Sequence, residues 1–298
     1  MMNTSKIIIV PKLSKYTLDM AKYKLTSDQL AEKYRREGID IERILGSHAR
    51  QEEALSALKS LFTAEQFISR DELTREVAAR AELVIALGGD DHLKFVSHFV
   101  DATPIMAVNS DPVLSNGGLA YFVASGFETV LRRLENEQFD IEEWARLEAM
   151  LNGSSVGLAT SEFFLGEDRR RDMSRHILEF DGAKEEQRCS GLLVVTGAGS
   201  SGWYDAAGRF LHSEGDKFSP KAKHARFLIT EPFGGRVTEY SMVKGTLEIG
   251  QELVVHSLND SRGVLTNDSI EEQEFNRGTK AVIRIADTPL GVVNMGAG

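Results

Sequence analysis

The chain has 298 residues, of which 42% are hydrophobic, so it is long enough for one large or two ordinary globular domains. Its formal net charge of −10 argues against a nucleic-acid-binding protein, because affinity for a phosphate backbone depends on an excess of Lys and Arg. Cys189 is the only cysteine, which excludes an intrachain disulfide framework and fits a reducing compartment.

Apolar runs alternate with helical stretches in the first part of the chain. The runs Ile7–Val10, Leu83–Leu87 and Pro104–Val108 predict strands that are buried on both faces. Helices are expected over Asp28–Glu37, with Ser27 as N-cap, over Ala49–Phe62 and over His92–Val100. Ile39, Ile41 and Ile44 predict an edge strand between the first two helices. This alternation predicts βαβ units in a doubly wound layer up to about residue 140.

The pattern changes beyond Trp144, where short alternating segments are separated by Asn152-Gly153 and Asp181-Gly182. Both dipeptides are typical of tight hairpin turns. Strands are expected at Leu147–Leu151, His176–Phe180, Leu192–Thr196, Arg226–Thr230, Leu253–Ser257, Val264–Thr266 and Ala281–Ile285. The second half of the chain is therefore expected to be mostly β.

The start of the chain carries no pattern of a targeting peptide, because Met1–Lys6 leads directly into the first apolar run. No apolar run approaches the length of a membrane span. We therefore expect a cytoplasmic protein with neither a membrane nor a nucleic acid as partner.

Gly88-Gly89-Asp90 lies between a predicted buried strand and a predicted helix. Glycines at this place let backbone N–H groups approach a phosphate, and the start of a helix offers positive potential. The Asp90 carboxylate can act there as a base or hold Mg²⁺. Alternatively, Asp90 only caps the helix, as Asp often does.

Gly197–Gly202 satisfies the G-x-G-x-x-G pattern of dinucleotide-binding dehydrogenases, with Glu214 and Asp216 about the right distance onward. The acidic residue of that fold should end a second strand, whereas the segment around Glu214 and Asp216 is polar and contains a glycine. We expect instead a Gly/Ser loop that contacts a ligand, with Trp203 or Tyr204 available to stack on a base. The alternative is a tight turn with core aromatic residues.

Four arginines gather within Glu167–His176, at positions Arg169, Arg170, Arg171 and Arg175. They suit bidentate phosphate contacts, or they form a solvated hairpin loop offset by the acidic residues beside them. The seven histidines show no metal-ligand spacing, so no metal site is expected.

Taken together, these motifs resemble the NAD kinase family, in particular its mitochondrial-type branch. Gly88-Gly89-Asp90 is similar to the family's Gly-Gly-Asp-Gly motif, and Val108–Pro112 is similar to its Val-Asn-Thr-Asp-Pro segment. Ser161-Glu162 falls where the family has an Asn-Glu pair, and Ser190 with Thr196–Trp203 resembles the mitochondrial-type Thr-Gly-Thr-Gly-Ser loop. The motifs follow the family's order over almost the whole chain.

The resemblance implies an α/β fold with a Rossmann-like N-terminal layer and a β-rich C-terminal domain. The expected domains cover residues 1–140 and 141–280, and residues 281–298 are expected to return to the first domain. The implied reaction transfers a phosphoryl group from ATP, bound with Mg²⁺, to the 2′-hydroxyl of NAD. A homodimer or homotetramer is the implied assembly.

The resemblance also assigns roles to single residues. Asp90 would be the general base that accepts the 2′-hydroxyl proton, and Glu162 would hold the ribose on the nicotinamide side. Ser201, Gly202 and Trp203 would line the adenosine site. The remaining implied substrate-binding residues are Gly88, Gly89, Asp91, Asn109, Ser161, Arg188, Ser190, Gly199 and Ser200.

Three positions depart from the family pattern. Ser190 replaces the Asp common in bacterial-type members, although the mitochondrial-type pattern also carries Ser there. Asp91 stands where the motif has glycine, and a like charge about 4 Å from a phosphate costs on the order of 4 kcal/mol at an effective dielectric of about 20. Ser161 replaces Asn, which removes an amide donor. The alternative function is therefore a catalytically impaired sensor or regulator that binds a dinucleotide without efficient phosphoryl transfer.

Overall fold

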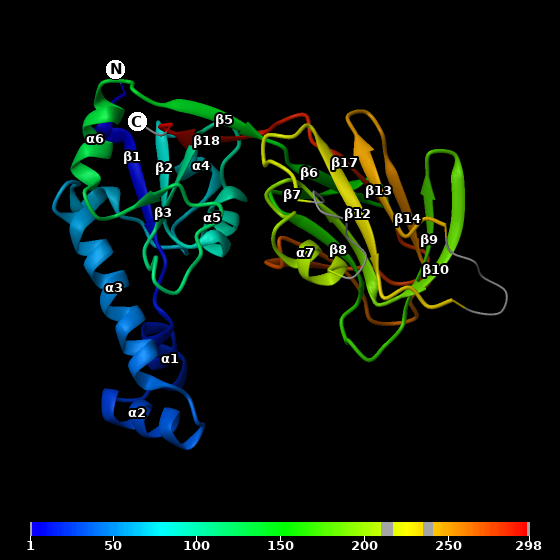
Figure 1. The fold of residues 1–298 in the computed structure, drawn as a ribbon, viewed down its shortest axis with the longest axis horizontal. Helices are drawn as coiled ribbons and strands as arrows, with labels where there is room; N and C mark the ends of the chain where they lie inside the picture. Colours follow the sequence, from blue (N-terminus) through cyan, green and yellow to red (C-terminus); the bar gives the residue numbers. More distant parts are fainter. Residues whose placement is uncertain (1, 210–216, 235–240, 297–298) are drawn as a thin grey trace. The chain divides into compact units, whose positions relative to one another are not determined.

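A computed structural model describes residues 2–209, 217–234 and 241–296 of the chain. The chain forms two compact units (Figure 1). The first unit comprises Met1–Ile141 and Gly291–Gly298, and the second comprises Glu142–Leu290.

The first unit is built on a mostly parallel sheet. Its strands lie in the order β1 (Ile7–Pro11), β2 (Leu83–Gly88), β3 (Ile105–Asn109), β18 (Leu290–Asn294) and β5 (Asp140–Trp144), and the short β4 (Phe122–Val123) also pairs with β3. The pairs β1–β2, β2–β3 and β3–β18 are parallel. The three strands predicted from continuous apolar runs are confirmed, and every residue of β2 and β3 is buried.

The helices of the first unit are α1 (Lys15–Tyr23), α2 (Ser27–Arg36), α3 (Ile41–Lys59), α4 (Arg75–Ala78), α5 (Asp90–Ser97) and α6 (Phe127–Glu135), with short 3₁₀ turns at Thr4–Lys6 and Ala64–Gln66. The first four α-helices of this unit start at side-chain caps, whereas α5 and α6 start at glycines. Thr26, rather than the predicted Ser27, caps α2 in a capping box with Gln29. The side chain of Asp40 accepts the Arg43 N–H and starts α3.

The predicted edge strand over Ile39, Ile41 and Ile44 is wrong, because Ile41 and Ile44 belong to the first turns of α3. Side chains three residues apart lie on the same face of a helix, so this spacing fits a helix as well as it fits a strand. The cap at Asp40 decides in favour of the helix.

Helices cover both faces of this sheet. Leu83 and Ile85 of β2 share a core with Leu58 of α3 and Phe127 of α6, so both helices pack on one face. The residues between them point to the opposite face, where α5 packs against β2 and β3. Figure 1 shows α3 and α6 on one side of the strands and α5 on the other. The doubly wound layer predicted from the sequence is therefore present.

The second unit contains two six-stranded sheets. One has the order β10 (Ala183–Cys189), β9 (Ser174–Phe180), β14 (Leu253–Ser257), β17 (Lys280–Ile285), β6 (Leu147–Leu151) and β7 (Ser154–Ala159). The other has the order β13 (Lys244–Glu248), β12 (His224–Thr230), β11 (Gly191–Val195), β8 (Glu162–Glu167), β15 (Gly263–Asn267) and β16 (Glu271–Glu274). Apolar residues of both sheets form one core.

The two predicted hairpin turns are confirmed. Asn152 and Gly153 connect β6 to β7 with φ values of 49° and 87°, and Asp181 and Gly182 connect β9 to β10 with φ values of 49° and 76°. Positive φ at both central residues is what a type I′ turn requires. The helix α7 (Trp203–Gly208) lies against the outer face of the second sheet, where Tyr204 packs on Leu193 and Leu228.

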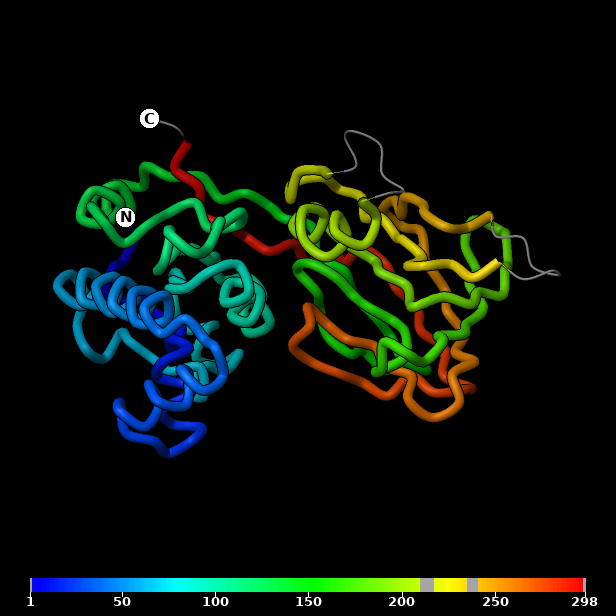
Figure 2. The backbone as a smooth tube through the Cα atoms, turned by 60° about the horizontal axis from the view of Figure 1, so that its bottom comes forward, coloured from blue at the N-terminus to red at the C-terminus, as the bar shows by residue number. Residues whose placement is uncertain are grey.

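The chain returns to the first unit later than residue 281. Lys280–Ile285 forms β17, which pairs with β14 and β6, and its alternating residues Ala281 and Ile283 are buried in the core of the second unit. The returning strand is β18, in which Val292 pairs with Ile105 of β3. Figure 2 shows the C-terminal segment, in red, beside the green strand β5, as the sheet order requires.

Candidate functional site

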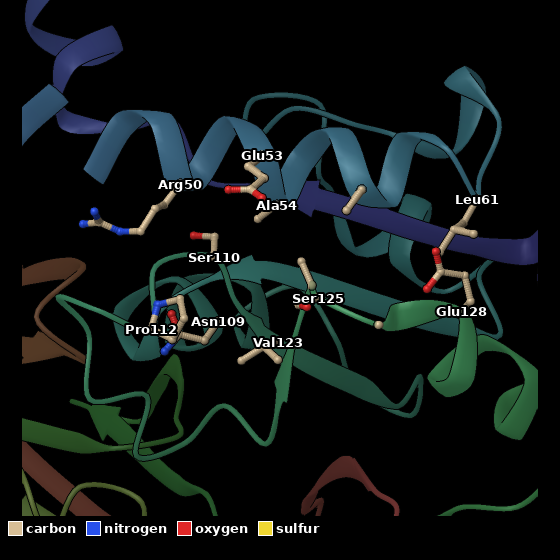
Figure 3. A pocket seen from close by; sticks show the side chains of 13 residues that line it. Arg50, Glu53, Ala54, Leu61, Asn109, Ser110, Pro112, Val123, Ser125 and Glu128 are labelled. Atoms are coloured by element: carbon tan, nitrogen blue, oxygen red, sulfur yellow. The ribbon is translucent and has the colours of Figure 1, made fainter. Parts of the chain in front are cut away.

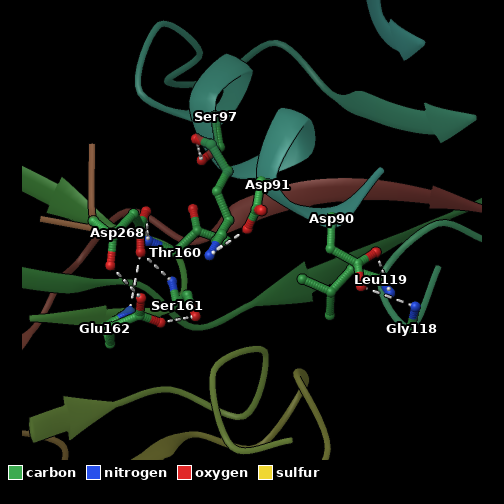
Figure 4. Close-up of polar contacts among 11 residues, drawn as sticks. Asp90, Asp91, Ser97, Gly118, Leu119, Thr160, Ser161, Glu162 and Asp268 are labelled. Carbon is green, nitrogen blue, oxygen red and sulfur yellow. Dashed lines mark hydrogen bonds and ion pairs between the residues drawn. The ribbon is translucent and has the colours of Figure 1, made fainter. Parts of the chain in front are cut away.

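The turn after β2 is shaped by close packing at Gly88. A Cβ atom at Gly88 would lie 2.6 Å from the Cβ of His92, so only glycine fits there. Gly89 is the N-cap of α5, and no side chain caps this helix. The Asp90 carboxylate instead accepts hydrogen bonds from the N–H groups of Gly118 and Leu119, each at 3.0 Å (Figure 4). The alternative in which Asp90 only caps the helix therefore does not describe its contacts.

A cavity of about 380 Å³ opens at the carboxyl edge of the parallel sheet. Four residues expected in the site, Gly89, Asp90, Asp91 and Asn109, line it together. The expected Gly88 ends the strand immediately before them. Ligands on open α/β sheets collect at this edge, beyond the carboxyl ends of the strands.

The negative charge of Asp91 has cations close by. Its side chain is 86% exposed, and its carboxylate lies 2.9 Å from Nζ of Lys94 one helical turn onward. The hydrogen bond from Lys94 lowers the pKa of Asp91, and the charges of Lys12 and Arg70 act in the same direction. The negative charge that replaces the expected glycine is therefore balanced locally by cations.

His92 joins three segments around this turn. Its fully buried ring donates from Nε2 to the Val10 carbonyl at 2.7 Å, and its Nδ1 accepts from the Arg70 guanidinium, whose Nη2 lies 2.7 Å away. Burial lowers the pKa of His92 to about 3, so the ring is neutral. The imidazole thus fixes the end of β1 and Arg70 against α5. Sequence reasoning did not single out His92, because a lone histidine carries no spacing signal.

The segment after β3 is held by Asn109 and Asp111. The Asn109 side chain accepts the Asp111 N–H at 3.0 Å and donates to the Ser115 carbonyl at 3.2 Å. Asp111 accepts from Nε of Arg50 at 2.6 Å and from Oγ of Ser47 at 2.5 Å, which ties this segment to α3. Burial acts to raise the pKa of Asp111, but the hydrogen bonds from Arg50 and Ser47 lower it. Asn109 therefore shapes the cavity as well as lining it.

In the second unit, β8 begins at Glu162, and Ser161 directly precedes it. The Ser161 hydroxyl donates to the Glu162 carboxylate, and Oγ of Ser269 lies 3.4 Å from the same carboxylate. The buried carboxylate of Asp268 accepts the N–H groups of Thr160, Ser161 and Glu162 at 2.9, 2.7 and 3.0 Å (Figure 4). Asp268 was not expected in the site, since the neighbouring sequence offers no motif.

The Gly/Ser loop packs directly on Ser161. A Cβ atom at Gly199 would lie 2.4 Å from the Ser161 carbonyl oxygen, so glycine is required at this close approach. Ser200 is buried, and its hydroxyl donates to the Gly197 carbonyl at 2.8 Å and accepts the Phe218 N–H at 3.1 Å. Those contacts make Ser200 a residue that shapes the loop.

Trp203 follows the exposed residues Ser201 and Gly202 at the start of α7. Its ring stacks on Phe164 with centroids 4.8 Å apart, and the residue is 41% exposed. Trp203 is therefore the aromatic residue available for stacking, whereas Tyr204 is buried in the core.

A cavity of about 610 Å³ lies beside this aromatic pair, and the expected residue Ser190 lines it together with Trp203. The Ser190 hydroxyl donates to Glu231, which also receives a hydrogen bond from Arg170. Arg188 is exposed on β10, with Nη2 3.7 Å from Glu186, and is not among the residues that line this cavity.

The arginine-rich segment forms ion pairs with neighbouring carboxylates. Arg170 pairs with Glu231, and Arg171 lies 3.7 Å from Asp172. These pairs favour the solvated-loop interpretation over a phosphate site.

The G-x-G-x-x-G match does not open a βαβ unit, because β11, which precedes it, is antiparallel to both β8 and β12. The structure therefore does not support the dehydrogenase alternative. Glu214 and Asp216, the acidic residues of that alternative, lie outside the described residues.

No group of three or more His, Cys, Asp or Glu side chains within residues 2–209, 217–234 and 241–296 is arranged to hold a metal ion. No described helix is long and apolar enough to cross a membrane.

Comparisons with known proteins point to one family. No protein-family model matches the chain. An NAD kinase of Methanopyrus kandleri is 29% identical over 137 residues, which is 45% of this chain and 49% of that protein. Mitochondrial NAD kinase 2 of Rattus norvegicus is 22% identical over 251 residues, which is 67% of this chain and 59% of that protein. The chain thus matches about half of the length of these curated relatives.

The fold agrees with these sequence matches. The crystal structure of an NAD kinase from Archaeoglobus fulgidus in complex with ATP superposes with a TM-score of 0.65 at 16% identity, covering 97% of this chain and 94% of that one. The expected two-domain fold with a Rossmann-like layer and a β-rich domain is therefore confirmed. The chain is thus similar in sequence to NAD kinases, and it shares the fold of one of them.

Proposed function

We propose that this chain is an NAD kinase, which transfers the γ-phosphoryl group of ATP to the 2′-hydroxyl of NAD and releases NADP and ADP. The observation that carries the proposal is Asp90, a carboxylate in a cavity at the carboxyl edge of the parallel sheet and in the first turn of α5. The names of the sequence relatives support the same reaction.

Asp90 acts in this proposal as the general base. Its carboxylate is oriented by the N–H groups of Gly118 and Leu119, each 3.0 Å away. It accepts the proton of the 2′-hydroxyl while the oxygen forms a bond to the γ-phosphorus and the bond from that phosphorus to the bridging oxygen of ADP breaks. Since each carboxylate oxygen accepts one N–H bond, lone pairs remain for the substrate hydroxyl.

Charge neutralisation on the donor side comes from several groups. The N–H groups at the start of α5 point to the same edge of the sheet as the cavity. Lys12 lines the cavity, and Mg²⁺ would arrive with ATP as its phosphate complex. Phosphoryl transfer depends mainly on such positioning and neutralisation.

Residues of the second unit supply dinucleotide contacts in this proposal. Glu162, held by the Ser161 hydroxyl, binds ribose hydroxyls, and Trp203 offers an exposed ring face to adenine. Ser201 and Gly202 present exposed backbone beside that ring. We also propose that Ser190, Gly199 and Arg188 contact the substrate. The protein is further proposed to belong to the mitochondrial-type branch.

The activity is tested by incubating the protein with ATP, Mg²⁺ and NAD and measuring NADP with a coupled dehydrogenase. Asp90→Asn should fold and bind NAD as the wild type does, while its turnover falls by about 10²-fold or more. Asp71→Asn, which makes the same change at an exposed position, should leave turnover unchanged. If NAD binds to the wild type but no NADP forms, the kinase proposal fails and the sensor alternative takes its place.

A cytoplasmic location and a homodimeric or homotetrameric assembly complete the proposal. The buried free thiol of Cys189 supports a reducing compartment. Light scattering on the purified chain measures the assembly, and a monomeric mass would contradict it.

A further inference from the structure

The sequence contains two Asn-Gly pairs, Asn116-Gly117 and Asn152-Gly153. In such a pair the backbone nitrogen of the glycine can attack the side-chain amide carbon of the asparagine, which makes asparagine a thermolabile residue. Glycine favours this attack, because it has no Cβ atom beside its N–H and its backbone turns freely. The two pairs are chemically identical, so their surroundings in the fold decide how fast each reacts.

The fold restrains Asn152 in its hairpin. The side-chain oxygen of Asn152 accepts the Lys280 N–H at 2.9 Å, and the N–H of Asn152 donates to the Lys280 carbonyl at 2.9 Å. The residues on either side, Leu151 and Ser154, are paired in the ladder between β6 and β7. The attack would have to break the side-chain hydrogen bond and turn the backbone of a paired hairpin, so Asn152 is protected.

Asn116 lacks these restraints. The segment 115–117 belongs to no helix or strand, and Asn116 is exposed. No described residue forms a hydrogen bond with the Asn116 side chain or accepts the Gly117 N–H. The amide carbon and the attacking nitrogen are therefore both available, and water has access to them.

We propose that Asn116-Gly117 is a site of spontaneous modification, at which the asparagine converts to isoaspartate. The Gly117 nitrogen gives up its proton and forms a bond to Cγ of Asn116, while the bond from Cγ to Nδ2 breaks and Nδ2 leaves as ammonia with that proton. Water then adds to one carbonyl of the resulting cyclic imide and opens it. Opening at the backbone carbonyl gives isoaspartate, and opening at the side-chain carbonyl gives aspartate.

Two hydrogen bonds anchor the backbone on either side of Asn116. On one side the Ser115 carbonyl accepts the side-chain amide of Asn109 at 3.2 Å. Asn109 lines both the cavity of Asp90 and the cavity drawn in Figure 3. On the other side the Gly118 N–H donates to the Asp90 carboxylate at 3.0 Å. Isoaspartate adds a methylene group to the backbone between these anchors, so they cannot both keep their positions.

The backbone at Gly117 has no room to absorb the extra group on the side of Asn109. A Cβ atom at Gly117 would lie 2.5 Å from Nδ2 of Asn109. We therefore expect the lengthened segment to move the N–H groups of Gly118 and Leu119 away from Asp90. This consequence rests on the proposed function, in which Asp90 is the general base, whereas the modification itself does not.

The test ages the full chain at mildly alkaline pH and follows both pairs by peptide mapping. Arg132 and Arg146 lie between the pairs, so trypsin places them in different peptides. Conversion of the amide to a carboxylate changes the mass of a peptide, and chromatography separates isoaspartate from aspartate. Asn116 should convert at least about tenfold faster than Asn152, because Asn152 must first give up hydrogen bonds.

The same chain in concentrated urea is the control for the local sequence. With the fold removed, the two pairs should convert at similar rates. Asn116→Gln should suppress the reaction at this position, because the longer side chain would have to close a larger ring. Asn152→Gln is the matched variant and should convert at Asn116 as the wild type does.

The kinase assay on the same samples measures the effect on Asp90. Turnover of the wild type and of Asn152→Gln should fall as isoaspartate forms, and the modified chain should be about tenfold slower than the fresh one. Asn116→Gln should keep its turnover during ageing. Asn116→Asp adds the charge without lengthening the backbone, so it should stay within about twofold of the fresh wild type because an exposed charge is screened.

Two results would overturn the modification site: equal conversion of the two pairs in the folded chain, or no isoaspartate at Asn116. Full conversion without loss of turnover would overturn its effect on Asp90. If the fresh protein forms no NADP, the proposed function fails, and the peptide maps still decide separately on the modification.

Discussion

The carboxylate of Asp268 accepts a hydrogen bond from the backbone N–H of Ser161 at 2.7 Å, although 107 residues separate the two in the chain. The same carboxylate also accepts the N–H groups of Thr160 and Glu162. Asp268 and Ser269 both have positive φ, at 50° and 57°, so the backbone adopts an uncommon conformation to present this side chain. Asp268 thereby fixes the start of β8 and the position of Glu162.

Asp268→Ala should therefore destabilise the protein by about 3 kcal/mol or more, because three buried N–H groups lose a charged acceptor. Asp268→Asn keeps one side-chain oxygen and should cost less. In the kinase assay, Asp268→Asn should raise the Michaelis constant for NAD more than it lowers turnover, because Glu162 is displaced while Asp90 is not. Urea unfolding and steady-state kinetics measure both effects, and an unchanged NAD constant would show that Asp268 serves stability alone.

Replacing Asp91 with Gly restores the family residue and removes an exposed charge from the lining of the donor-side cavity. Because Lys94, Lys12 and Arg70 remain, the potential at this edge becomes more positive. The apparent Michaelis constant for ATP should fall about two- to tenfold at low salt, with the NAD constant little changed. The gain should shrink at high salt, since Asp91 is exposed and already screened there.

Asp91→Asn removes the charge without adding glycine flexibility and is the control for that experiment. A rise in the Mg²⁺ requirement with lower activity would instead identify Asp91 as a ligand of the metal ion. Unchanged ATP and Mg²⁺ constants in both variants would show that this turn does not face the donor phosphates.

Two glycines of the Gly/Ser loop should respond differently to alanine. At Gly199 a Cβ atom would lie 2.4 Å from the Ser161 carbonyl oxygen, whereas at Gly202 the nearest atom would be 3.7 Å away. Gly199→Ala should lower the free energy of unfolding by about 1–3 kcal/mol. For Gly202→Ala, the free energy of unfolding should stay within about 0.5 kcal/mol of the wild type. Thermal unfolding of the pair checks this, and equal losses would contradict the close approach of the loop to Ser161.

His176 makes stability depend on pH. Both ring nitrogens are buried and have no hydrogen-bond partner, and burial lowers the pKa of His176 from 6.5 to about 4. The unfolded chain therefore binds a proton that the folded chain does not bind between about pH 6.5 and pH 4. The free energy of unfolding should keep its full value above about pH 6.5 and fall by up to about 3 kcal/mol as the pH drops to about 4.

His176→Leu should remove that part of the pH dependence and stabilise the protein by about 1–3 kcal/mol near neutral pH, because two unpaired polar atoms leave the core. Urea unfolding from pH 4 to pH 8 compares the two proteins. If the free energy of unfolding of His176→Leu falls with pH as steeply as that of the wild type, the acid sensitivity belongs to other groups, among them the buried His92.

Local sequence was sufficient for the elements whose signals are local. The runs Leu83–Leu87 and Pro104–Val108 are apolar at every position, which only a strand buried on both faces can use. Asn152-Gly153 and Asp181-Gly182 fix their hairpins because both residues must adopt positive φ. Gly88-Gly89-Asp90, between a buried strand and a helix, lies where a cavity is found at the end of β2.

Tertiary structure decided what local sequence left open. Asp90 could cap α5, but it accepts N–H groups 28 and 29 residues onward. The positioning of Ser161 by Asp268 and of Arg70 by His92 has no sequence signature at all. Such partners meet only after the sheets assemble, because a hydrogen bond depends on distance in space and not on separation along the chain.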